Sequence, residues 1–188
     1  MKLKPSWSLL LVGLAVIGFW LMGSYNGLVQ KAQEVDAQWA QVETSYQRRY
    51  DLIPNLVEAA KGYLDQEKEI LETIAMARQG YAGANTVAEK VEASAQVESA
   101  LARLLVIIEN YPELKSNETI AQVMDELAGT ENRVSVERMR YNEIVREYNT
   151  RVKSFPVVMI AGMFGFSDKP YFEADSAAQS APKVDFSN

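Results

Sequence analysis

The stretch Arg48-Arg49-Tyr50-Asp51-Leu52-Ile53-Pro54-Asn55-Leu56-Val57 places a proline inside a long helical pattern. Around it, apolar residues recur at alternating steps of four and three, the period of a helix with one buried stripe. These residues are Val35, Trp39, Val42, Tyr46, Ile53, Leu56, Ala60 and Tyr63. Pro54 lacks a backbone N–H and disfavours helical geometry at Ile53, so we expect the helix to kink or restart there. Arg49 lies on the stripe itself, where an unpaired charge would be costly to bury.

The last helical pattern is the most regular in the chain and keeps steps of four and three without slipping. Its positions are Ile120, Met124, Leu127, Glu131, Val134, Arg138, Tyr141, Val145, Tyr148, Val152 and Phe155. Such sustained spacing indicates a coiled-coil-like seam within a bundle, ended by Pro156. No segment alternates with the period of a strand. The sequence therefore predicts an all-α fold, an elongated antiparallel bundle of three to four helices.

Several local signals divide the segment between these two patterns. Thr86 and Glu89 have the spacing of a capping box, and the helix after them stops before Pro112. Its expected apolar face contains Val87, Val91, Leu101, Leu105 and Ile108. Ser116 or Asn117 is expected to cap the last helix. Residues 30–80 could form one kinked helix or two helices, and we favour a turn near Gly62.

The composition removes many kinds of chemistry from consideration. The 188 residues include no cysteine and no histidine, which excludes disulfides, the usual zinc sites and histidine-based catalysis. The formal charge is −6. Without Lys2 and Lys4, 17 basic residues face 25 acidic ones, so we expect no binding to nucleic acid. No Asp-rich or glycine-rich ligand loop is present, and we expect no cofactor and no metal.

The N-terminal region predicts a membrane anchor. No charged residue occurs between Lys4 and Lys31, and the apolar run from Trp7 to Met22 approaches the length that spans a bilayer. A cleaved signal peptide is the alternative, but the chain lacks a small-x-small cleavage site after the run. We therefore expect a short basic N-terminus at residues 1–5 and an uncleaved transmembrane helix at residues 6–29. The positive-inside rule then places the N-terminus in the cytoplasm and the bulk of the chain outside it.

The C-terminal region contains a second apolar segment, from Phe155 to Phe166, which is too short to span a bilayer. We expect a strap packed along the bundle, which would complete a domain at residues 30–172. The alternative is a membrane-dipping or partner-binding element, with Phe164 and Phe166 as candidate contacts. Residues 173–188 predict a flexible tail. Its Val184 and Phe186 alternate at strand spacing and could add to the edge of a partner's sheet.

Four charged residues occupy stripe positions and form the expected charged core layer: Arg49, Glu67, Glu131 and Arg138. They could simply extend outward at partly exposed positions. If the first and last helices pack antiparallel, residues whose numbers add up to 180 could face each other, which pairs Arg49 with Glu131. This layer would then set the register of the bundle. A catalytic carboxylate set of Glu67, Glu109 and Glu131 is the disfavoured alternative.

Several motifs together resemble the LemA family, over Tyr25 to about Glu173. They are residues 49–57, 61–63, 77–78, 111–115, 131–133, 141–142, 148–149, 164–166 and 171–172. The resemblance implies an N-terminal membrane helix and a helical bundle, and it supplies no catalytic residues. Gln66 stands where the family often has histidine, and Val157-Val158 replaces a more polar pair. Family descriptions place the N-terminus outside the cell, whereas the charges here favour the cytoplasm.

From these features we predict a single-pass protein of the bacterial inner membrane that acts as a scaffold or adaptor and is not an enzyme. Its expected partners are the lipid bilayer, through the N-terminal helix, and a protein, through the C-terminal segment or tail. A homo-oligomer is compatible with the sequence. The alternative function is an accessory or regulatory subunit of a membrane enzyme such as a protease.

Overall fold

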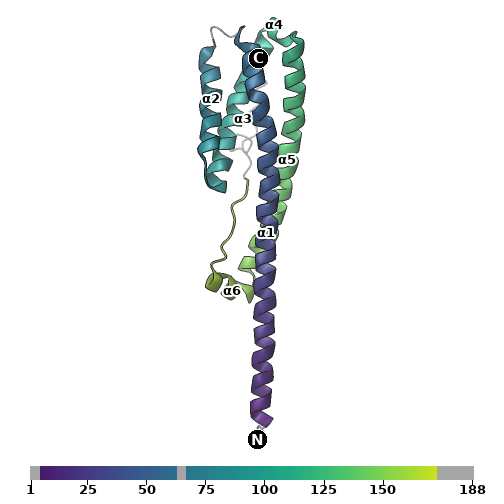
Figure 1. The fold of residues 1–188 in the computed structure, drawn as a ribbon, viewed down its shortest axis with the longest axis vertical. Coiled ribbons are helices and arrows are strands. Elements are labelled where there is room, and N and C mark those ends of the chain that lie inside the picture. The colour runs from purple at the N-terminus through teal and green to yellow at the C-terminus, as the bar shows by residue number, and fades with distance from the viewer. Residues whose placement is uncertain (1–4, 63–66, 173–188) are drawn as a thin grey trace, which may run out of the picture. The chain divides into compact units, whose positions relative to one another are not determined.

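The computed structural model describes residues 5–62 and 67–172, and these residues contain helices and no strand (Figure 1). The helices are α1 (Pro5–Lys61), α2 (Lys68–Gly83), α3 (Val87–Asn110), α4 (Pro112–Lys115), α5 (Glu118–Lys153) and α6 (Val157–Phe164). The predicted all-α class is confirmed.

Helix α1 continues through Pro54 and does not restart there, contrary to one of the two expectations. Pro54 is exposed, while Ile53 and Leu56 beside it are buried. A proline inside a helix costs about 3 kcal/mol. Burial of two aliphatic side chains contributes about 1.5–3 kcal/mol each, enough to offset that cost. The helix ends instead at Lys61, which confirms the turn predicted near Gly62.

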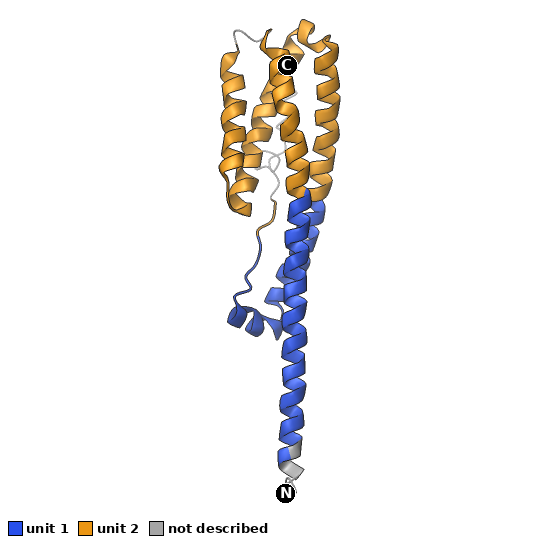
Figure 2. Cartoon of the chain, in the orientation of Figure 1, with its two compact units in different colours: residues 1–41, 139–169 blue, residues 42–138, 170–188 orange. Residues whose placement is uncertain are grey.

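The chain divides into two compact units, which share α1 and α5 (Figure 2). Unit 1 comprises residues 1–41 and 139–169, and unit 2 comprises residues 42–138 and 170–188. Within each unit, α1 and α5 run antiparallel. In unit 1 the rings of Trp39 and Tyr141 lie 5.5 Å apart, the pairing expected from the register. This division runs across the single domain that the sequence suggested for residues 30–172.

Unit 2 is a bundle built on the predicted stripes. Its buried apolar residues include Val42, Tyr46, Ile53, Leu56, Ile70, Ile74, Val97, Leu101, Leu104, Ile108, Ile120, Leu127 and Val134. The capping box of α3 is confirmed, since the Thr86 side chain accepts from the Glu89 N–H and the Glu89 carboxylate accepts from the Thr86 N–H. Asn117 caps α5, because its Oδ1 accepts from the backbone N–H groups of Thr119 and Ile120.

Unit 1 contains the N-terminal part of α1, the C-terminal part of α5, and α6. Its core includes Leu28, Val35, Tyr141, Val145, Tyr148, Val152, Val157, Ile160 and Ala161. The expected apolar strap contains the short helix α6, whose C-cap residue Gly165 has a positive φ of 76°. The prediction that Phe155 continues the buried stripe is wrong, since this side chain is 81% exposed. Helix α5 ends at Lys153, so Phe155 no longer follows its helical phase.

The N-terminal part of α1 is exposed and apolar. Large hydrophobic side chains from Trp7 to Met22 are solvent-accessible, and Ser24 is the first buried residue after this run. Among the residues that the structure describes, α1 is the one helix with the length and composition needed to cross a membrane. This agrees with the predicted membrane association.

Candidate functional site: an arginine–tyrosine layer in unit 2

Arg49 lies on α1 with 7% of its surface exposed, and its Nη1 contacts Oε2 of Glu131 on α5. The structure thus brings together the two residues that the register argument paired. Burial lowers the pKa of Arg49, while Glu98 and neighbouring tyrosines oppose that shift. A guanidinium remains charged despite such a shift. The pair is therefore a buried cation facing a carboxylate that is about half exposed.

Arg138 has a different set of partners. Its Nε donates to the Tyr46 hydroxyl at 2.7 Å, and its Nη2 donates to Glu98 Oε1 on α3 at 2.5 Å. The guanidinium carbon also lies 5.3 Å from the ring centre of Tyr46 and 5.2 Å from that of Phe172. Arg138 therefore connects three segments of unit 2 through one ion pair, two hydrogen bonds to the Tyr46 hydroxyl and two cation–π contacts.

Glu98 was not among the predicted site residues, although the sequence contains a signal for it. The apolar face predicted for α3 steps from Val91 directly to Leu101. Steps of three and four across this gap fall on Ser94 and Glu98. Ser94 is buried and accepts a hydrogen bond from the Tyr46 hydroxyl at 3.0 Å. Polar residues at skipped stripe positions thus marked where α3 contributes to the layer.

Three tyrosines extend the layer between α1 and α2. The ring centres of Tyr46 and Tyr50 lie 5.5 Å apart, and the Tyr81 ring lies 4.7 Å from Tyr50. Burial raises the pKa of all three phenols further above neutrality, so they are protonated well beyond neutral pH. The hydroxyls of Tyr50 and Tyr81 and the Nε of Arg49 are buried without a hydrogen-bond partner among the described residues.

The remaining acidic candidates lie outside this layer. Glu67 occupies the N-cap position of α2 without a side-chain capping bond, and no ion pair joins it to another residue in the described part of the chain. Glu109 is exposed near the end of α3. No group of three acidic side chains in residues 5–62 and 67–172 is arranged to hold a metal ion. The layer thus joins paired charges to protonated phenols, a composition typical of structural polar networks.

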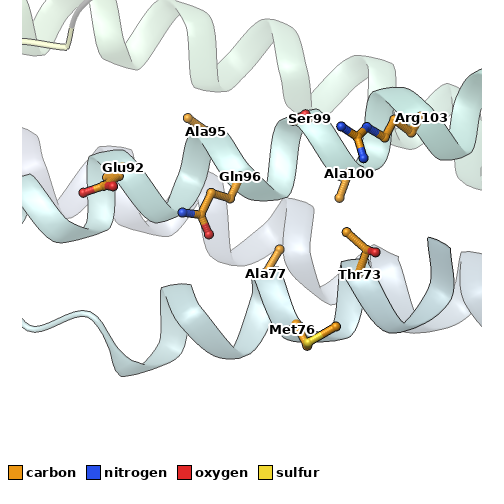
Figure 3. A pocket seen from close by; sticks show the side chains of 9 residues that line it. All are labelled: Thr73, Met76, Ala77, Glu92, Ala95, Gln96, Ser99, Ala100 and Arg103. Carbon is orange, nitrogen blue, oxygen red and sulfur yellow. The ribbon is translucent and has the colours of Figure 1, made fainter. Parts of the chain in front are cut away.

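A groove lies between α2 and α3 in unit 2, with a volume of about 650 Å³ (Figure 3). Small side chains form much of its lining, including Ala77, Ala95, Ser99 and Ala100. Met76 stands at its rim on α2, and Arg103 lies on α3. This is an open surface groove and lies apart from the charges of the arginine–tyrosine layer.

The predicted C-terminal contacts have separate outcomes. Phe164 and Phe166 both pack against Tyr25 of α1, with ring centres 4.9 and 5.8 Å from the Tyr25 ring. They are therefore part of unit 1, although Phe164 keeps 58% of its surface exposed. Val184 and Phe186 lie outside the described residues.

Comparisons with known proteins agree with the family resemblance found in the sequence. The LemA family profile matches residues 38–186. Magnetosome protein MamQ 2 of Paramagnetospirillum magneticum is 24% identical, over 89% of this chain and 72% of the relative. MamQ of Magnetospirillum gryphiswaldense is 25% identical, over 85% of this chain and 68% of the relative. Protein LemA of Metamycoplasma hominis is 22% identical, over 86% of this chain and 74% of the relative. The chain belongs to the LemA family.

Proposed function

We propose that this protein is a membrane-anchored helical scaffold or adaptor of the bacterial inner membrane, without catalytic activity of its own. The observation that carries the proposal is the continuity of α1. One helix supplies both the exposed apolar run from Trp7 to Met22 and the buried stripe of unit 2. A membrane anchor that is also a core helix ties the bundle to the bilayer without an intervening linker.

The chemistry of unit 2 also supports a structural role. Arg49 and Arg138 are each engaged by a carboxylate from a different helix. Phenols are protonated at neutral pH, and burial raises the pKa of the neighbouring tyrosines further, which makes them poor bases or nucleophiles. A layer of this kind favours one packing arrangement of the bundle.

Within this proposal, a protein partner binds the C-terminal tail. Phe164 and Phe166 already contact Tyr25, so their rings are partly used within unit 1. The tail contains Val184 and Phe186, whose alternation suits addition to a sheet edge. The charges of Lys2 and Lys4 favour a cytoplasmic N-terminus, with the body and tail on the opposite side of the membrane.

The partner contact is tested by placing a photo-crosslinking amino acid at Ser187 of the full chain in intact cells. We expect one discrete crosslinked product that disappears when Val184 and Phe186 are both replaced by alanine. The same probe at Met76, in the α2–α3 groove, is the matched control and should give no such product. A product that survives the double alanine variant, or arises only from Met76, would overturn the assignment to the tail.

Orientation is tested with single cysteines, because the chain has none of its own. Val106 is exposed on α3, so Val106→Cys should react with a membrane-impermeant maleimide in cells whose outer membrane has been permeabilised. Labelling only after the inner membrane is opened would reverse the proposed orientation.

A further inference from the structure

We propose that α6 is a second membrane contact, a short helix that lies in the interface of the same bilayer that α1 enters. This inference rests on the membrane anchoring proposed above and adds a site that the anchor alone does not require. It concerns unit 1 only, in which α6 and the N-terminal part of α1 both lie.

The first observation is that α6 is apolar on all sides but covered on one. Its sequence is Val-Val-Met-Ile-Ala-Gly-Met-Phe, with no charged or strongly polar residue. Val157, Ile160 and Ala161 are buried, while Met159 and Met163 on another face are 64% and 80% exposed. A helix that is hydrophobic all round normally needs cover on every face.

The second observation is that α6 is attached to α1 at the end of the anchor through its buried face. Phe164 and Phe166 pack edge-on against Tyr25. Tyr25 follows Ser24, the residue at which α1 changes from exposed to buried. Helix α6 is therefore attached next to the end of the exposed apolar run of α1, the run that the proposed anchor places in the bilayer.

The length and charge of the region fit an interfacial position. Eight helical residues extend about 12 Å, which is too short to span a bilayer but suits a helix lying in its surface. Nearby, Lys153 pairs with Asp168 at 3.1 Å and Lys169 with Asp36 at 3.0 Å. These lysines are already neutralised, so the contact is expected to depend on apolar burial more than on anionic lipid.

We therefore define the lipid-facing stripe as Phe155, in the turn before α6, together with Met159 and Met163, which lie one turn apart on the helix. The first of these precedes α6 and is 81% exposed. Large exposed apolar side chains grouped in this way mark contact sites. Their continuity with the anchor assigns the contact to lipid.

The test uses spin labels on single cysteines in the full chain, reconstituted in phosphatidylcholine vesicles. Met163→Cys probes the stripe, and Val16→Cys probes the anchor. Met139→Cys is the matched control, because Met139 is also an exposed methionine of unit 1 and lies about 21 Å along α5 from its end at Lys153. Collisions with oxygen report lipid, and collisions with a water-soluble nickel chelate report water.

We expect collisions of the nickel chelate with a label at position 163 to be several-fold rarer than at position 139, and oxygen collisions to be several-fold more frequent. Adding phosphatidylglycerol should leave both values unchanged. Equal values at positions 163 and 139, with lipid exposure at position 16, would overturn the inference and leave the anchor intact. Protection of position 163 from both reagents would indicate a covering protein and also overturn it. Water exposure at position 16 would refute the anchor itself.

Discussion

Replacement of Arg138 by methionine tests whether the arginine–tyrosine layer holds unit 2 together. The change removes the ion pair with Glu98, two hydrogen bonds to the Tyr46 hydroxyl and two cation–π contacts. The Glu98 carboxylate and the buried Tyr46 hydroxyl then lose their common partner, although Ser94 still accepts from that hydroxyl at 3.0 Å. Methionine retains most of the apolar stem, so the loss is mainly electrostatic.

The magnitude follows from the burial of the pair. Removing one partner of a fully buried ion pair costs about 3–5 kcal/mol. Here about a quarter of each side chain is exposed, since Arg138 is 26% and Glu98 25% accessible, and water reduces that cost. The two cation–π contacts add about 0.5–1 kcal/mol each. We therefore expect Arg138→Met to lower the free energy of unfolding by about 2–3 kcal/mol.

The assay is urea unfolding of the full chain in detergent micelles, followed by far-UV circular dichroism. Glu98→Gln alone should cost about 1 kcal/mol, because the amide oxygen still accepts a hydrogen bond. The double variant should cost about 1–2 kcal/mol less than the sum of the single variants, since the two residues share one interaction. Arg133→Met on the exposed face of α5 is the control and should change stability by less than about 0.5 kcal/mol.

Two results would refute this reasoning. In the first, Arg138→Met costs no more than Arg133→Met, which means that the layer adds nothing beyond an exposed charge. In the second, Arg138→Met and Glu98→Gln are additive, which means that the short contact between them carries no coupling.

Three further predictions test other parts of the molecule. Thr86→Ala breaks the capping box of α3 and should cost about 1 kcal/mol in the same urea assay. Burial raises the pKa of Tyr50 and Tyr81 in the folded chain, so the unfolded chain loses these protons at lower pH. The free energy of unfolding should therefore fall as pH rises above about 10. In a pH titration, tyrosinate absorbance should appear together with the loss of helical structure. The Asn149 side chain donates to the Lys169 carbonyl at 2.9 Å and accepts from its N–H at 2.8 Å, so Asn149→Ala should increase hydrogen exchange in the segment after α6.

Each of these predictions has a control or a contrary result. Ser99→Ala, at an exposed position inside α3, should leave stability unchanged or slightly higher, because alanine has the better helix propensity. Tyrosinate that forms fully while the helices remain intact would contradict the burial of Tyr50 and Tyr81. Asn132→Ala, at an exposed position of α5, should leave exchange after α6 unchanged; if Asn149→Ala does the same, the two hydrogen bonds do not hold that segment.

The fold was largely predictable because its helices follow a strict apolar period. Most buried residues of α1 from Val35 to Ala60 fall on the steps of four and three that the sequence shows, and Tyr50 is an exception. Local signals for the ends of α3 and the start of α5 were equally clear, since Thr86 and Asn117 both cap as expected. Periodicity of this kind survives single unfavourable residues, which is why α1 passes through Pro54.

The candidate site was less predictable because its residues come from faces that periodicity does not distinguish. Arg49 and Glu131 could be paired from their numbers alone, since an antiparallel register links them. Glu98 interrupts an apolar stripe, and such an interruption normally indicates solvent exposure. Glu98 could be paired with Arg138 only once the position of α3 beside α5 was known.

Within the stretch from Arg49 to Val57, Arg49 thus helps to determine the register of α1 against α5 in unit 2. A slip of one heptad would put Arg49 opposite Arg138 and separate it from Glu131. In the observed register each arginine has its own carboxylate, from α5 in one case and from α3 in the other. Partly buried ion pairs add little net stability, but separating one of them is costly. The layer therefore selects one register by penalising the alternatives, and because the two acids lie on different helices, the same charges also determine where α3 packs.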